Sequence, residues 1–123
     1  MSSRAWQRGL AAENLAADYL ASRRVRILAR NVRCKGGEID ILCLDGEFLA
    51  VVEVRLRSER LYGGALASVT PAKQRKIIRA ARFVLQSSAA LRRRPMRFDV
   101  IGVQGPPEGR FEISWIKDAF RAR

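Results

Sequence analysis

The acidic residues with the most suggestive spacing lie in two neighbouring apolar segments. Glu38 and Asp40 interrupt the apolar segment 37–42, and Glu53 comes two residues before Arg55 in the next one. A core strand normally carries β-branched or aromatic residues at such positions. Carboxylates are ligands of hard divalent cations, and a nearby cationic side chain stabilises phosphate charge. The pattern therefore predicts a site that holds a divalent cation against a phosphate.

The two segments are predicted to be neighbouring strands. Residues 38–44 and 48–57 alternate as strands do, and an Asp-Gly turn signal lies at 45–46. A connecting loop of two or four residues would place Asp40 and Glu53 on one face, whereas a three-residue loop would separate them. Two carboxylates this close repel each other unless a cation or a shared proton lies between them.

An ordinary charged surface is the alternative interpretation of the same residues. Because side chains alternate along a strand, Glu38 shares a face with Asp40, and Glu53 shares a face with Arg55. Ion pairs of Glu38 with Arg55 and of Glu53 with Arg57 would then explain the acids without any metal.

A third carboxylate is expected near the same site. Residues 5–22 are predicted to form a helix whose apolar stripe contains Trp6, Leu10 and Leu20, and Glu13 lies near the middle of that stripe. A buried carboxylate without partners is very unfavourable. Glu13 therefore needs a cation or hydrogen-bond donors.

A second helix is predicted from Thr70 and Pro71, which fit the N-cap and the first helical position. Lys73 lies on the side of this helix that faces the sheet, near the positive end of the helix dipole, and could place its ammonium over a phosphate. A surface lysine with a buried stem is the alternative. Gln74, at the other edge of that face, is a weaker candidate.

The remaining segments complete an α/β architecture. A first strand is predicted at 25–33, a loop with Tyr62-Gly63-Gly64 at 58–69, a basic connector at 91–95, strands at 96–103 and 111–115, and a C-terminal helix at 116–121. This order of elements predicts one domain, a helix-flanked mixed sheet of about five strands.

Composition favours a polyanionic partner. The chain has 24 Lys and Arg against 12 acids, a net charge of +12, and this excess attracts nucleic acid in a salt-dependent manner. A merely solvated basic surface is the alternative. The expected contacts to the nucleic-acid backbone are arginines: Arg57, Arg75, Arg79, Arg82, Arg92, Arg93 and Arg94.

Other features exclude several classes of protein. The chain has no histidine, which rules out imidazole general bases and histidine-ligated zinc. Hydrolysis would therefore depend on carboxylates, a hard cation such as Mg²⁺, and Lys or Arg. No secretory signal or membrane span is visible. We expect a cytoplasmic protein in which Cys34 and Cys43 are reduced.

Four motifs resemble the YraN family of small bacterial proteins: RGxxxE at 8–13, GEID at 37–40, VEVR at 52–55 and RFDV at 97–100. The closing Asp-Ala-Phe at 118–120 fits as well, so the resemblance covers nearly the whole chain. That family resembles the restriction-endonuclease-like superfamily, close to archaeal Holliday-junction resolvases. The resemblance implies a three-layer sandwich with the element order α-β-β-β-α-β-β-α.

The resemblance also implies roles for individual residues. Glu13, Asp40 and Glu53 would bind Mg²⁺ or Mn²⁺, and Arg55 stands where the superfamily has its catalytic lysine. Arginine cannot act as a base, because it keeps its proton in proteins. Either the cation and the carboxylates activate the water, or Lys73 replaces the missing lysine, or catalytic activity has been lost.

Three functions follow as hypotheses. The first is a Mg²⁺-dependent endonuclease or resolvase that acts on DNA, including branched DNA, and that works as a homodimer. The second is a non-catalytic nucleic-acid-binding module on the same fold, with the acids in structural ion pairs. The third is a basic scaffold that docks onto an acidic protein or an rRNA-bearing particle.

Overall fold

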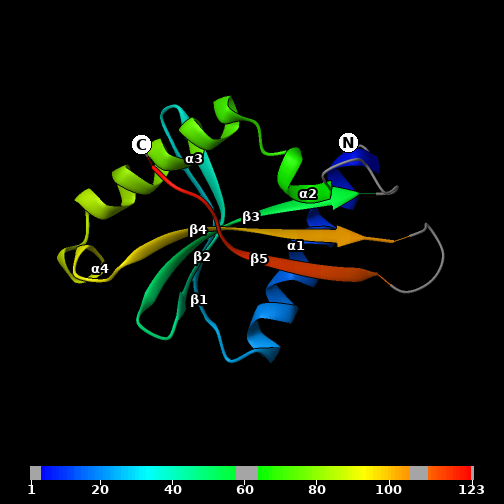
Figure 1. Cartoon of the computed structure of the whole chain (residues 1–123), viewed down its shortest axis with the longest axis horizontal. Coiled ribbons are helices and arrows are strands. Elements are labelled where there is room, and N and C mark those ends of the chain that lie inside the picture. The colour runs from blue at the N-terminus through cyan, green and yellow to red at the C-terminus, as the bar shows by residue number, and fades with distance from the viewer. Residues whose placement is uncertain (1–3, 58–63, 106–110, 123) are drawn as a thin grey trace.

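A single mixed sheet organises the structure, a computed structural model that describes residues 4–57, 64–105 and 111–122. All five strands belong to this sheet, in the order β1-β2-β3-β4-β5; β3 and β4 are parallel and the other neighbours are antiparallel. Figure 1 shows α1 and α3 on opposite sides of the sheet. The predicted α/β sandwich with a five-stranded mixed sheet is confirmed. The elements are α1 (Arg4–Ser22), β1 (Arg26–Cys34), β2 (Gly37–Asp45), β3 (Phe48–Arg57), α2 (Gly64–Ala67), α3 (Pro71–Gln86), α4 (Ala89–Arg92), β4 (Met96–Gln104) and β5 (Glu112–Phe120).

Two apolar clusters, one on each face, hold the layers together. On the α3 face, Ile77 of the helix packs with Ile39, Leu42 and Val51 of the strands. On the α1 face, Leu20 and three alanines of α1 pack with residues such as Ile41, Val52 and Ile101. Small alanines let the helix approach the sheet closely, and the buried aliphatic residues supply the hydrophobic stabilisation.

Helix α3 begins as the sequence predicts. Thr70 is the N-cap, its hydroxyl accepts a hydrogen bond from the Lys73 amide at 3.2 Å, and Pro71 occupies the first turn. This cap satisfies an amide that would otherwise lack a partner in the first turn. The start of the helix, and with it the position of Lys73, is therefore fixed by local sequence.

The β2–β3 hairpin has the two-residue loop that brings the acids together. Asp45 pairs with Phe48 across residues 46 and 47, and the ladder continues to Ile41 opposite Val52. The same register places Asp40 opposite Glu53, but the ladder stops one step before that pair. The strands therefore separate at the two acids.

The predicted C-terminal helix at 116–121 is wrong, because β5 extends to Phe120. Phe120 is buried and stacks on Phe98 with the ring centroids 5.0 Å apart, and this packing fixes the end of the chain on the sheet. Asp118 has a φ of 53°, so the strand is irregular there rather than helical. Short helices α2 and α4 also occupy segments predicted as loop and connector.

Three further expectations need comment. Leu10, predicted on the buried stripe of α1, is 38% exposed. Tyr62 and Gly63, together with the side chains of Trp6 and Arg57, lie outside the described part of the chain. Within the described residues, no helix is long and apolar enough to cross a membrane.

Candidate functional site

All five residues predicted to be catalytic or metal-binding line a pocket of about 560 Å³ at the end of the sheet where β2 and β3 separate. We call it the acid pocket. Helix α1 borders it on one side of the sheet and α3 on the other. Its lining residues are Gly9, Leu10, Glu13, Asn31, Arg33, Glu38, Asp40, Glu53, Val54, Arg55 and Lys73.

An irregularity in β2 directs Asp40 into the gap between the strands. Ile39 packs on the α3 face and Ile41 packs on the α1 face, although a regular strand would place both on one face. Asp40 lies between them, and its Oδ2 accepts a hydrogen bond from the Val54 amide at 2.9 Å. The carboxylate thus takes a backbone donor of β3 just beyond the point where the β2–β3 ladder ends.

Asp40 and Glu53 form a close carboxyl pair. Glu53 is only 3% exposed, Asp40 is half-buried, and each carboxyl group shifts the pKa of the other. Burial, followed by the charge of Asp40, raises the pKa of Glu53 to about 8. Burial also raises the pKa of Asp40, although the Val54 amide opposes this change. At neutral pH the pair therefore retains a proton, as expected for two close carboxyls without a cation between them.

Two cationic side chains lie beside Glu53 on the α3 face. Lys73 Nζ is 3.6 Å and Arg55 Nη1 is 3.7 Å from Glu53 Oε1. Arg55 Nε also donates to Ser68 Oγ at 2.9 Å, and that hydroxyl donates to the Ala65 carbonyl. Ser68 therefore fixes the guanidinium, while Lys73 is held by its place in the first turn of α3.

Glu13 is buried as predicted, and two protein donors bind one of its oxygens. Its Oε1 accepts hydrogen bonds from Arg30 Nε at 2.9 Å and from Asn31 Nδ2 at 3.0 Å. The negative charge of Glu13 also acts on the carboxyl pair, because it helps to raise the pKa of Asp40. Asn31 has a φ of 53°, a conformation that asparagine tolerates better than most residues, so β1 is also irregular beside the pocket.

The pocket suits a hard divalent cation in one specific way. Within the described residues, no three acidic or cysteine side chains are arranged to hold a metal ion. Mg²⁺, however, usually takes only one or two carboxylates and completes its shell with water and substrate phosphate. Asp40 and Glu53 provide such a pair, and a cation there would replace the proton that they share.

Several predicted residues lie elsewhere. Gln74 donates to the Val69 carbonyl at 3.0 Å and does not line the acid pocket. Arg92 binds the last carbonyls of α3, and Arg94 binds carbonyls of the β2–β3 turn. Arg93 is exposed, and the three arginines of α3 line a different groove, described below. Glu38 borders the pocket and pairs with Arg33 at 3.7 Å.

A buried acid outside the pocket carries more hydrogen bonds than any residue that lines the pocket. Asp99 is fully buried and accepts hydrogen bonds from Arg97, from Trp115 Nε1 and from the Asp118 amide. Its donors satisfy both of its oxygens, so it fixes β5 against β4 and leaves no open ligand position. The sequence signal was an acid in the middle of an apolar strand, the same signal that marked Asp40.

The fold and the pocket define an α/β protein with a proton-sharing carboxyl pair where the strands of a mixed sheet diverge. The model of the Uncharacterised protein family UPF0102 matches residues 12–103, which include the four acids and the three cationic residues that line the pocket. A UPF0102 protein from Nitrosococcus oceani is 43% identical over 114 residues, 93% of this chain and 91% of that protein. One from Pseudomonas putida is 43% identical over 112 residues, 91% of each chain.

A UPF0102 protein from Stutzerimonas stutzeri is 40% identical over 114 residues, 93% of this chain and 94% of that protein. The chain therefore belongs to the UPF0102 family. This is the YraN family that the motifs resemble, so the resemblance is confirmed.

Proposed function

We propose that this protein is a Mg²⁺- or Mn²⁺-dependent endonuclease that hydrolyses phosphodiesters of DNA in the acid pocket. The observation that carries the proposal is the close Asp40–Glu53 pair with Lys73 and Arg55 on one of its oxygens. Burying two mutually repelling carboxyls destabilises the protein, and a cation-binding role explains why the fold keeps them there.

Each residue has a distinct task in this proposal. Asp40 and Glu53 hold the cation, which when bound activates water and neutralises developing phosphate charge. Arg55, fixed by Ser68, binds a non-bridging phosphate oxygen. Lys73 is as close to Glu53 as Arg55 is, and unlike an arginine it can give up a proton. It is therefore the better replacement for the lysine of the superfamily.

Glu13 acts on the pair through its charge. Its hydrogen-bonded oxygen is already taken by Arg30 and Asn31, so Glu13 orients β1 and α1 around the pocket. In addition, the net charge of +12 supports a polyanionic substrate, which would be attracted to the protein at low salt.

A second candidate is a non-catalytic nucleic-acid-binding module. Two observations favour it: one oxygen of Glu13 already has two protein donors, and the described residues hold no group of three metal-binding side chains. In this alternative the carboxyl pair and its two cations form only a structural ion-pair network.

Cleavage of branched, flapped, single-stranded and linear DNA with Mg²⁺ and Mn²⁺ tests the proposal. We expect metal-dependent cleavage that Glu53→Gln abolishes, that Arg55→Lys retains, and that Lys73→Ala reduces at least tenfold, within the range for one lost acid–base or charge-stabilising group. Lys35→Ala removes the same charge from an exposed hairpin and should cleave normally. Binding without cleavage of any substrate would support the module instead.

A further inference from the structure

A second pocket of the molecule is lined by one side of α3 and by Arg121, which follows β5, and it shares no lining residue with the acid pocket. It has a volume of about 580 Å³ and is lined by Pro71, Gln74, Arg75, Ile78, Arg79, Arg82 and Arg121. We call it the arginine groove. Four of its seven lining residues are arginines and none is acidic, so its electrostatic potential favours an anion.

Helical spacing produces the row of arginines. Arg75, Arg79 and Arg82 stand four and three residues apart, which places them on one side of the helix. The groove spans positions 71–82, roughly 16 Å along the axis at 1.5 Å per residue. Three guanidiniums spread along such a length can contact successive phosphates of one strand, so the row suits a polyanion better than one small ligand.

The groove is built by tertiary structure as well as by the helix. The end of the chain runs beside α3 (Figure 1), where Asp118 holds Arg121 at 2.7 Å. Asp118 is itself fixed, because its backbone amide donates a hydrogen bond to the carboxylate of the buried Asp99. On the other side, the Arg79 side chain lies against Gly36 so closely that a Cβ there would be 2.8 Å from Nη1.

The three helix arginines are available to a ligand. Among the described residues, no acid lies within ion-pair distance of Arg75, Arg79 or Arg82. Three guanidiniums this close repel one another, which an anion would relieve.

An exposed aromatic residue indicates which kind of anion the groove would bind. Phe83 is 56% exposed, the highest value among the large apolar residues described, and follows Arg79 by one turn along α3. A basic groove beside an exposed aromatic ring is the arrangement that binds unpaired nucleotides, since the backbone follows the charges and a base stacks on the ring. Duplex DNA would leave the ring without a partner, because its bases are already stacked.

We propose that the arginine groove binds the backbone of single-stranded nucleic acid, with Phe83 stacking on one of its bases. The groove is separate from the acid pocket, yet both border the first turns of α3, through Gln74 and Lys73 respectively. The inference rests on the proposed function only for the class of substrate.

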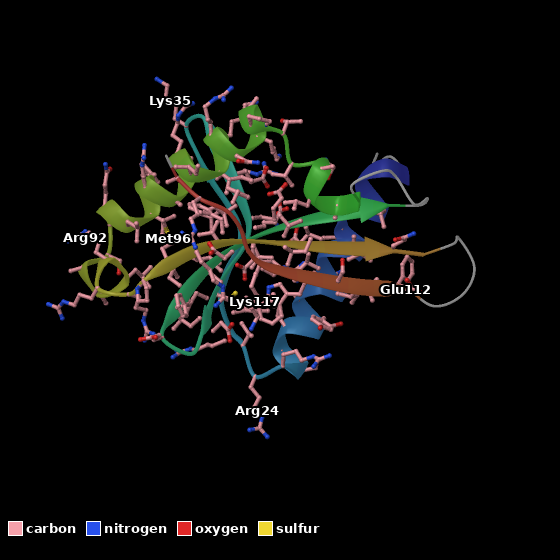
Figure 2. All side chains as sticks on the ribbon, viewed as in Figure 1. Arg24, Lys35, Arg92, Met96, Glu112 and Lys117 are labelled. Carbon is pink, nitrogen blue, oxygen red and sulfur yellow. The ribbon has the colours of Figure 1, made fainter. Side chains whose placement is uncertain are left out.

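Binding measured in EDTA separates the groove from catalysis. The probes are a short fluorescein-labelled oligothymidylate and a duplex of the same length, followed by anisotropy at several salt concentrations. Arg79→Ala/Arg82→Ala should weaken single-strand binding and reduce the salt slope by about 1.4, at about 0.7 per lost contact. Arg23→Ala/Arg26→Ala removes the same charge near Arg24, on the side away from α3 (Figure 2), and should leave binding nearly unchanged. Equal losses of single-strand affinity in the two double variants would overturn the proposal that the groove is the binding site.

Phe83→Ala should weaken single-strand binding about 5- to 150-fold, the value of one stacked base, and Phe83→Trp should restore it. The control is Phe111→Ala, which removes another exposed ring. The assignment would be overturned if Phe83→Ala lost affinity for duplex and single strand equally. It would also be overturned if polyglutamate displaced the probe as efficiently as unlabelled oligothymidylate does. If binding depends on the groove but no substrate is cleaved with Mg²⁺, the inference stands and the endonuclease proposal fails.

Discussion

Replacing Glu53 by glutamine should stabilise the protein, and increasingly so as the pH rises. The pKa of Glu53 is raised from 4.5 to about 8 by burial and by Asp40. Between these values the folded protein holds a proton that the unfolded chain has lost, so the free energy of unfolding falls as pH rises. Each pH unit costs about 1.4 kcal/mol, and a rise from about pH 5 to about pH 8 therefore costs up to about 4 kcal/mol.

Glu53→Gln removes this cost, because the amide cannot ionise yet can still donate a hydrogen bond to Asp40. The assay is urea unfolding in EDTA across this pH range. We expect a variant close to the wild type at about pH 5 and more stable by about 2–4 kcal/mol at about pH 8. Glu47→Gln, in the exposed hairpin turn, is the control and should show no such pH trend. A difference between Glu53→Gln and wild type that does not change with pH would refute the buried, proton-sharing pair.

Three other outcomes follow from the structure. Asp99→Ala should destabilise the fold by about 3–5 kcal/mol, measured by urea unfolding, because the Trp115 indole and the Asp118 amide lose their acceptor and Arg97 keeps only Asp45 as a partner. Gly37→Ala should cost about 1–3 kcal/mol in the same assay, since its Cβ would collide with the backbone of α3, whereas Gly9→Ala in open space should stabilise by about 0.5–1 kcal/mol. Cys34 should react with a thiol reagent in the native state, and Cys43, buried with its pKa raised to about 12, should react only on unfolding.

Much of the architecture could be predicted because local signals determine it. The Thr70-Pro71 cap fixed the start of α3, and the Asp-Gly turn fixed the hairpin. The end of the chain could not be predicted in this way. Residues 116–121 read as a helix, but pairing with β4 and the stacking of Phe120 on Phe98 override that preference.

The sequence predicted which residues line the candidate site better than it predicted how they are arranged. Strand alternation allowed Asp40 and Glu53 to share one face for a loop of two or four residues, and helical phase made Glu13 and Lys73 candidates beside them; the structure has the two-residue loop. The hydrogen-bond partners of these residues were not predictable, because they come from other elements of the fold. Arg30 of β1, for example, donates a hydrogen bond to Glu13 of α1. The irregularity of β2 at Asp40 could not be predicted either, because the alternation of side chains between the two faces assumes a regular strand.

Calorimetry of Mn²⁺ and Mg²⁺ binding at neutral pH tests the central claim most directly. Performed in two buffers of different ionisation enthalpy, it measures both affinity and proton release. The wild type should bind the metal with release of about one proton, the one that Asp40 and Glu53 share. Asp40→Asn and Glu53→Gln should lose this binding, while Glu47→Gln should bind as the wild type does. Absence of binding in the wild type, or unchanged binding in both pocket variants, would contradict a metal site at this carboxyl pair.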